Sequence, residues 1–163
     1  MSRIQASVLR KLTRTSKRAD QQLEKRVTRA RSFYMRFDAS FRIGGAGAYH
    51  EEITEITGIS PSSSHKVGEY RSRYSKKPWA EDIWILSSPK SETCTLDEHL
   101  AWLWSQIQPH EAYFLQLIEK STWADICLGC LSQSPYPVLS LEKESTNIIK
   151  ALNLSLAFNF TCV

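Results

Sequence analysis

The stretch Phe33-Tyr-Met-Arg-Phe-Asp-Ala-Ser-Phe-Arg-Ile43 decides the fold class. Apolar residues occupy every second position from Phe33 to Ile43, and the positions between them are Tyr, Arg, Asp, Ser and Arg. Because successive side chains of a β-strand point to opposite faces of a sheet, this alternation predicts a long strand with one buried face. The polar second face indicates that helices cover the sheet on one side only.

Three further strands and several helices are predicted after this strand. Gly58 ends a short helix that begins at Glu51, and Thr95 with Glu98 forms a capping box that starts a helix. The expected segments are helices at 51–57, 96–107 and 109–120, strands at 82–87, 123–131 and 154–163, a loop at 60–79, and a last helix that Ser140 caps and Asn153 ends. The order β-α-β-αα-β-α-β predicts an α+β fold, a two-layer sandwich in which helices cover one face of a four-stranded sheet.

The 163 residues divide into two parts by charge. Residues 1–31 hold ten Lys and Arg against two acidic residues, a net charge of +8, whereas the other 132 residues hold 11 basic and 15 acidic side chains, a net charge of −4. The apolar stripe of the basic segment is narrow, which is typical of a marginal helix or of disorder. We therefore expect a basic N-terminal arm at 1–32, helical or disordered, and a single α+β domain at 33–163.

Several classes of protein are excluded or disfavoured. No apolar run reaches the roughly 18 residues that a membrane span needs. Residues 1–30 lack the apolar core of a secretory signal, so a cytoplasmic location with reduced cysteines is expected. An organellar transit peptide is the alternative interpretation of this Arg-rich segment.

Two motifs share features with cofactor sites, but neither fits in detail. Cys127 and Cys130 have the spacing of half a zinc site, yet positions i and i+3 of a strand point to opposite faces, which favours two small core residues. The connector Gly44-Gly-Ala-Gly47 follows a strand as a phosphate-binding loop does, but His50 stands where a third glycine is needed. We expect no cofactor and no metal. The sequence also shows no set of catalytic residues. An enzyme with a site at 44–50 therefore ranks third, after the two binding functions given below.

Two positive features indicate binding. The loop from His65 to Trp79 interleaves cations with aromatic rings, a combination that holds single-stranded nucleic acid and also dominates protein interfaces. Trp102 lies on the polar side of its helix and is a candidate contact residue, whereas Trp84, in an apolar strand, is expected in the core. The candidate binding residues are Lys66, Tyr70, Arg71, Arg73, Tyr74, Lys76, Lys77, Trp79 and Trp102.

The body of the chain resembles a known bacterial family. The residues that carry the likeness are Glu52-Ile-Thr-Glu-Ile-Thr-Gly-Ile-Ser-Pro61, Gly68-Glu69, Trp84, Ser87, Leu96-Asp-Glu-His-Leu100 with Leu103, and Leu139-Ser-Leu141 before the terminal strand. Over about residues 33–163 they resemble the family called domain of unknown function 4279, although the glycine-rich connector at 44–47 differs from the polar turn of that family. The resemblance implies a small cytoplasmic bacterial domain of α+β type. It implies no activity and no catalytic residues.

Two functional hypotheses follow. The first is a non-enzymatic interaction module that binds another protein, for example one that neutralises a toxin or a phage component. The alternative is a nucleic-acid-binding protein that uses the arm at 1–31 and the basic, aromatic loop at 65–79. Binding through the arm would weaken steeply with salt, by about 0.9 log units per phosphate for each tenfold increase.

Overall fold

A computed structural model describes residues 35–45, 47–70 and 74–163. These residues form one compact unit that runs from Met35 to Val163. The basic arm at 1–32 lies outside the described residues, as do the first two residues of the expected strand at 33–43. No helix among the described residues combines the length and the apolar character that crossing a membrane requires.

Five strands, four α-helices and three short 3₁₀ turns make up the described chain. In chain order they are β1 (Met35–Gly44), η1 (Gly47–Tyr49), α2 (His50–Thr57), β2 (Ser63–His65), β3 (Ile83–Ser87), α3 (Leu96–Ile107), η2 (Gln108–His110), α4 (Glu111–Lys120), β4 (Trp123–Ser132), η3 (Glu144–Thr146), α5 (Asn147–Ala151) and β5 (Ser155–Cys162). The α+β class is therefore confirmed.

The strands form one mixed sheet in the order β2-β3-β1-β4-β5, with β1 at its centre. The β1 strand pairs antiparallel with β3 and with β4, and β5 adds to β4 in parallel. The expected count of four strands is wrong, because β2 pairs with β3 inside the stretch expected to be a loop. Ser63-Ser-His65 has no apolar alternation, so only its main-chain pairing reveals this strand.

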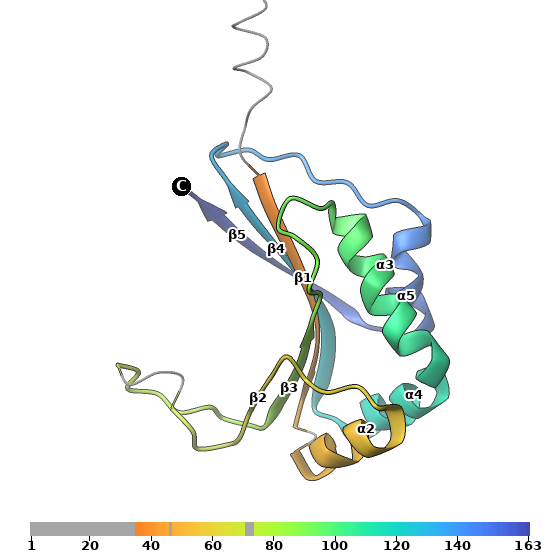
Figure 1. The fold of residues 1–163 in the computed structure, drawn as a ribbon. Coiled ribbons are helices and arrows are strands. Elements are labelled where there is room, and N and C mark those ends of the chain that lie inside the picture. Colours follow the sequence, from red (N-terminus) through yellow and green to blue (C-terminus); the bar gives the residue numbers. More distant parts are fainter. Residues whose placement is uncertain (1–34, 46, 71–73) are drawn as a thin grey trace, which may run out of the picture. The chain divides into compact units, whose positions relative to one another are not determined.

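The helices lie on one side of the sheet, and the core fills the space between the two layers (Figure 1). Ala39, Phe41 and Ile43 of β1 are buried, as the alternation predicts. Phe41 lies at the centre of this core, with its ring edge-on to Trp84 at 6.1 Å and to Phe114 at 5.6 Å between ring centroids. Trp84 is fully buried, which confirms its expected place in the core.

The helix boundaries follow the local chemistry of the chain. Thr95 and Glu98 form the predicted capping box, since each side chain bonds the backbone N–H of the other residue. Pro109 lies in the 3₁₀ turn between α3 and α4, so α4 begins at Glu111 rather than at 109.

The last helix is shorter than predicted. Ser140 lies outside it, because a 3₁₀ turn precedes α5 and only Asn147–Ala151 are α-helical. Here the backbone N–H of Glu142 donates to the Asp97 carboxylate, a contact with α3 that sequence spacing does not reveal. Asn153 does adopt the expected left-handed conformation, with φ at 50°.

His99 of α3 makes the stability of this core depend on pH. Its side chain is buried, and burial lowers its pKa, although the negative charge of Asp38 partly opposes the shift. As pH falls below about 6.5, the usual pKa of histidine, the unfolded chain binds a proton that folded His99 does not bind. His99 therefore contributes a decrease in the free energy of unfolding on acidification.

We expect His99→Gln to reduce this pH dependence. Between pH 7.5 and 5.5 the wild type should lose up to about 1.4 kcal/mol more unfolding free energy than the variant loses. Urea denaturation at both pH values measures the difference, and any general destabilisation by the substitution cancels in it. An equal loss in the two proteins would contradict the assignment.

Candidate functional site

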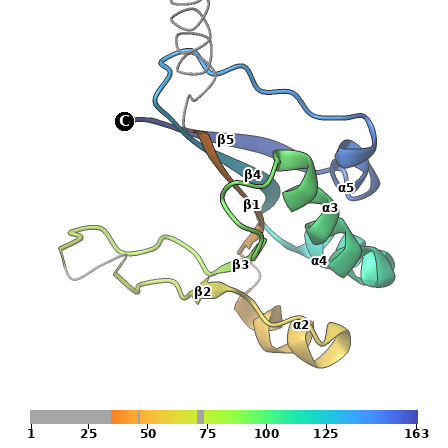
Figure 2. The ribbon, with the colours of Figure 1, turned by 45° about the horizontal axis from the view of Figure 1, so that its top comes forward.

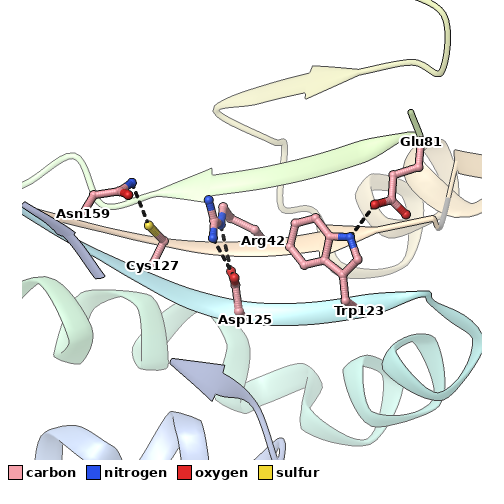
Figure 3. A network of polar contacts seen from close by, with 6 residues as sticks. All are labelled: Arg42, Glu81, Trp123, Asp125, Cys127 and Asn159. Atoms are coloured by element: carbon pink, nitrogen blue, oxygen red, sulfur yellow. Dashed lines mark hydrogen bonds and ion pairs between the residues drawn. The ribbon is translucent and has the colours of Figure 1, made fainter. Parts of the chain in front are cut away.

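The face of the sheet that points away from the helices carries the predicted polar residues of β1. The strand register places Arg42 of β1 directly opposite Asp125 of β4, and Ser40 opposite Cys127. Figure 3 shows Arg42, Asp125 and Cys127 in a row along β1 and β4. We call this the open face, because none of the described helices covers it.

A bidentate ion pair lies at the centre of the open face. Arg42 donates from Nε to Asp125 Oδ1 at 2.8 Å and from Nη2 to Asp125 Oδ2 at 2.6 Å. Both side chains are largely covered, and the hydrogen bond with Asp125 raises the pKa of Arg42. A pair with this geometry holds the guanidinium in one orientation.

Trp123 lies flat on the sheet beside this pair. Its Nε1 donates to Glu81 Oε1 at 2.6 Å, and the Arg42 guanidinium carbon lies 5.6 Å from the centroid of its ring. Gly44 of β1 makes room for the ring, since a Cβ at this position would lie 2.2 Å from ring atoms of Trp123. Gly44 was expected in the connector after the strand, but it is the last residue of β1 and packs against an indole.

The two cysteines of the C-x-x-C motif point to opposite faces, as predicted. Cys127 shares the open face with Asn159, whose Nδ2 donates to the thiol sulfur at 3.3 Å, whereas Cys130 pairs with Phe37 on the helix side. Burial raises the pKa of both thiols, which keeps them protonated and poorly nucleophilic. The described residues contain no group of three or more His, Cys, Asp and Glu side chains that could hold a metal ion.

The basic, aromatic loop is a hairpin that projects beside the open face (Figures 1 and 2). It continues the β2–β3 pairing, since Gly68 N donates to Trp79 O at 2.9 Å and Trp79 N donates to Glu69 O at 2.8 Å. The Trp79 ring stacks on His65 with 4.5 Å between centroids. The exposed candidates are Lys66, Tyr70, Tyr74, Lys76 and Lys77, while Arg71 and Arg73 lie outside the described residues.

The structure does not bring Trp102 together with this hairpin. Trp102 belongs to α3 in the helix layer, and its half-buried ring packs against the hydrophobic core. Trp79 instead shares a cavity of about 440 Å³ with residues that the sequence did not single out. The cavity is lined by Arg42, Trp79, Ala80, Glu81, Ile83, Trp123 and Asp125.

A second surface lies along β5, at one end of the sheet order. Leu156, Phe158 and Phe160 align with Ile126, Leu128 and Cys130 of β4, so they lie on the helix side of the sheet. Their exposed fractions nevertheless rise from 37% to 47% and 55% along the strand. The helices cover the start of β5 and leave its end open (Figure 1). Alternation predicted this strand, but it could not show that the apolar face is half-exposed.

Phe158 and Phe160 stack with 6.0 Å between ring centroids. Beside Phe160 lies a cavity of about 430 Å³ whose other wall is the segment Ser134-Pro-Tyr-Pro-Val138. Tyr136 and Val138 of this wall are among the most exposed large apolar residues of the described chain. We call Leu156, Phe158, Phe160, Tyr136 and Val138 the β5 apolar strip.

Gly44→Ala tests the arrangement of the open face. The added methyl group must displace the Trp123 ring, although the backbone of Gly44 has no positive φ that would itself resist alanine. We expect a loss of about 1–3 kcal/mol of unfolding free energy. In Trp123→Ala the same Gly44→Ala change should cost much less, because the ring is gone. Equal costs in the two backgrounds, measured by denaturation, would contradict the packing described.

Comparison with known proteins identifies the family. The family model described as domain of unknown function (DUF4279) matches residues 33–162 of the chain. No curated protein and no solved structure matches the chain. The match begins two residues before the compact unit that starts at Met35. It ends one residue before the last residue of that unit, Val163. The chain therefore belongs to the family of domain of unknown function 4279.

Proposed function

We propose that this protein is a protein-interaction module that takes an extended segment of a partner protein as a sixth strand beside β5. The observation that carries the proposal is the composition of this edge strand. Ser155-Leu-Ala-Phe-Asn-Phe-Thr-Cys162 contains no charged residue and no proline over eight residues. Natural sheets protect their edges with charge, proline or short length, so an unprotected long edge favours pairing with another chain.

The two ends of the sheet support this assignment by their difference. The opposite edge strand, β2, has only three residues, which is one of the usual protections of an edge. At the β5 end, main-chain N–H and C=O groups that point away from β4 can bond an added strand, as in other complexes formed by strand addition. Main-chain pairing supplies affinity in such complexes, and side-chain pockets supply specificity.

The side chains around β5 define the chemistry of the partner. Apolar residues at every second position of the incoming strand would cover the exposed rings of Phe158 and Phe160. The cavity between Phe160 and the 134–138 segment has the volume to receive an apolar side chain from that strand. Aromatic residues of this kind often dominate the energy of a protein interface.

Binding rather than catalysis is the proposed role. The buried Cys127 and Cys130 thiols have raised pKa values, which disfavours a nucleophilic function for them. We propose a cytoplasmic location, in which the four free cysteines would stay reduced.

A photo-cross-linking amino acid at position 158 tests the proposal. In the native host we expect one dominant adduct, with the cross-link in an extended segment of the partner that alternates apolar residues. Phe160→Lys in the same chain should abolish the adduct, because a charge on the edge opposes pairing. The matched control carries the cross-linker at Ile56 of α2, whose exposed fraction of 51% is close to the 47% of Phe158. Mass spectrometry of the adducts provides the measurement.

Three results would overturn the proposal. One is the same adduct pattern from positions 56 and 158, and another is an adduct that persists in Phe160→Lys. The third is an adduct made only with a second copy of this chain. In that case light scattering of the purified protein should show a dimer that Phe158→Lys dissociates, and β5 would be a dimer edge.

A further inference from the structure

We propose that the cavity between the hairpin and the open face binds a nucleotide unit, with its base against Trp79 and Trp123 and its phosphate on the hairpin lysines. This site lies apart from β5 and does not depend on the function proposed there. The sequence suggested nucleic-acid binding through the arm and the loop alone. The structure adds residues of β1 and β4 that no motif indicated.

Both indole rings are fixed before any ligand binds. Trp79 stacks on His65 with an angle of 18° between the ring planes. Trp123 lies over Gly44 and is held by its hydrogen bond to Glu81. Since ordering flexible side chains costs free energy on binding, rings held in place favour stacking with a planar ligand.

The cavity also holds polar groups that can bond the edge of a base. Arg42 uses Nε and Nη2 for Asp125, and no hydrogen bond of the described residues engages its Nη1. Glu81 uses one carboxylate oxygen for Trp123. The cavity therefore offers N–H donors beside a carboxylate acceptor, which suits the edge of a base with both carbonyl and amino groups.

The cavity and the hairpin differ in charge. The lining holds Arg42 with Glu81 and Asp125, so its formal charge is −1 and it disfavours a phosphate. Lys76 and Lys77 are exposed on the hairpin, three and two residues before Trp79 in the chain. A phosphate attached to the bound base would meet these lysines rather than the acidic floor.

These features favour an unpaired nucleotide over a double helix. Bases of a duplex are stacked on one another, so their faces are not available to protein rings. A free nucleotide and a single strand share the required chemistry. Stacking platforms combined with basic side chains are the usual means of holding single strands.

The test uses the full chain, fluorescence anisotropy of a labelled 12-nucleotide oligo-dA strand, and competition by AMP. Trp79→Ala should weaken binding of the strand roughly 5- to 100-fold, the range found for loss of one stacked base. The control is Tyr136→Ala, which removes an exposed aromatic ring from the β5 apolar strip and should change the affinity less than about twofold.

A salt titration separates this site from the charge of the basic arm. Replacing both Lys76 and Lys77 by alanine should reduce the slope of log affinity against log salt by about 0.7, the value for the loss of one phosphate contact on a single strand. Glu81→Gln keeps an acceptor for Trp123 and should retain binding within a few fold.

The outcomes are distinct. If AMP displaces the strand with a dissociation constant similar to that of the strand, the ligand is a free nucleotide. If AMP does not displace the strand, the ligand is a single strand. Unchanged binding in Trp79→Ala, or no binding to either probe at 50 mM salt, would overturn the inference. Neither result bears on β5, because Trp79 and the β5 apolar strip belong to separate surfaces.

Discussion

The burial of one side of β1 against the helix layer is the constraint on which the rest of the structure depends. Phe41 is fully buried and contacts the rings of Trp84 and Phe114, which brings β1, β3 and α4 together. Because side chains alternate along a strand, fixing Phe41 inward fixes Arg42 outward. The chemistry of the open face is therefore a direct consequence of the packing of the core.

Two glycines allow large or charged side chains to pack closely against the open face of the sheet. At Gly44 the missing side chain admits the Trp123 ring, and at Gly129 it admits the Asp38 carboxylate, where a Cβ would lie 2.2 Å from Asp38 Oδ2. Each glycine lies directly across the β1–β4 pairing from the residue that it accommodates. Side chains that would otherwise project from the sheet can thus lie along it.

Sequence patterns predicted the α+β class, the one-sided sheet and most of the helices and strands. Alternation identified β1, and the Thr95–Glu98 capping box marked the start of α3. The patterns missed β2, because Ser63-Ser-His65 is stabilised by pairing with β3 rather than by an apolar face. They also overestimated the last helix, because residues 144–146 form a 3₁₀ turn and the backbone N–H of Glu142 bonds Asp97 of α3.

The surfaces were less predictable than the fold, since they depend on which strands become neighbours. The loop at 65–79 was singled out by its composition, and Trp79 does line a cavity. Its partners Arg42 and Trp123 lie 37 and 44 residues away in the chain and are brought there by strand pairing. The exposure of Phe158 and Phe160 could not be read from their alternation, because an edge strand and a central strand can share the same pattern.

The proposed function requires that β5 receives a partner strand along its outer edge. Hydrogen–deuterium exchange of the purified chain, compared with the chain equilibrated in extract of its native host, measures this most directly. We expect the peptide covering Ser155–Cys162 to gain protection in the extract while peptides from β1 and β4, already paired on both sides, do not change. Unchanged exchange of the β5 peptide in the presence of extract would contradict the account.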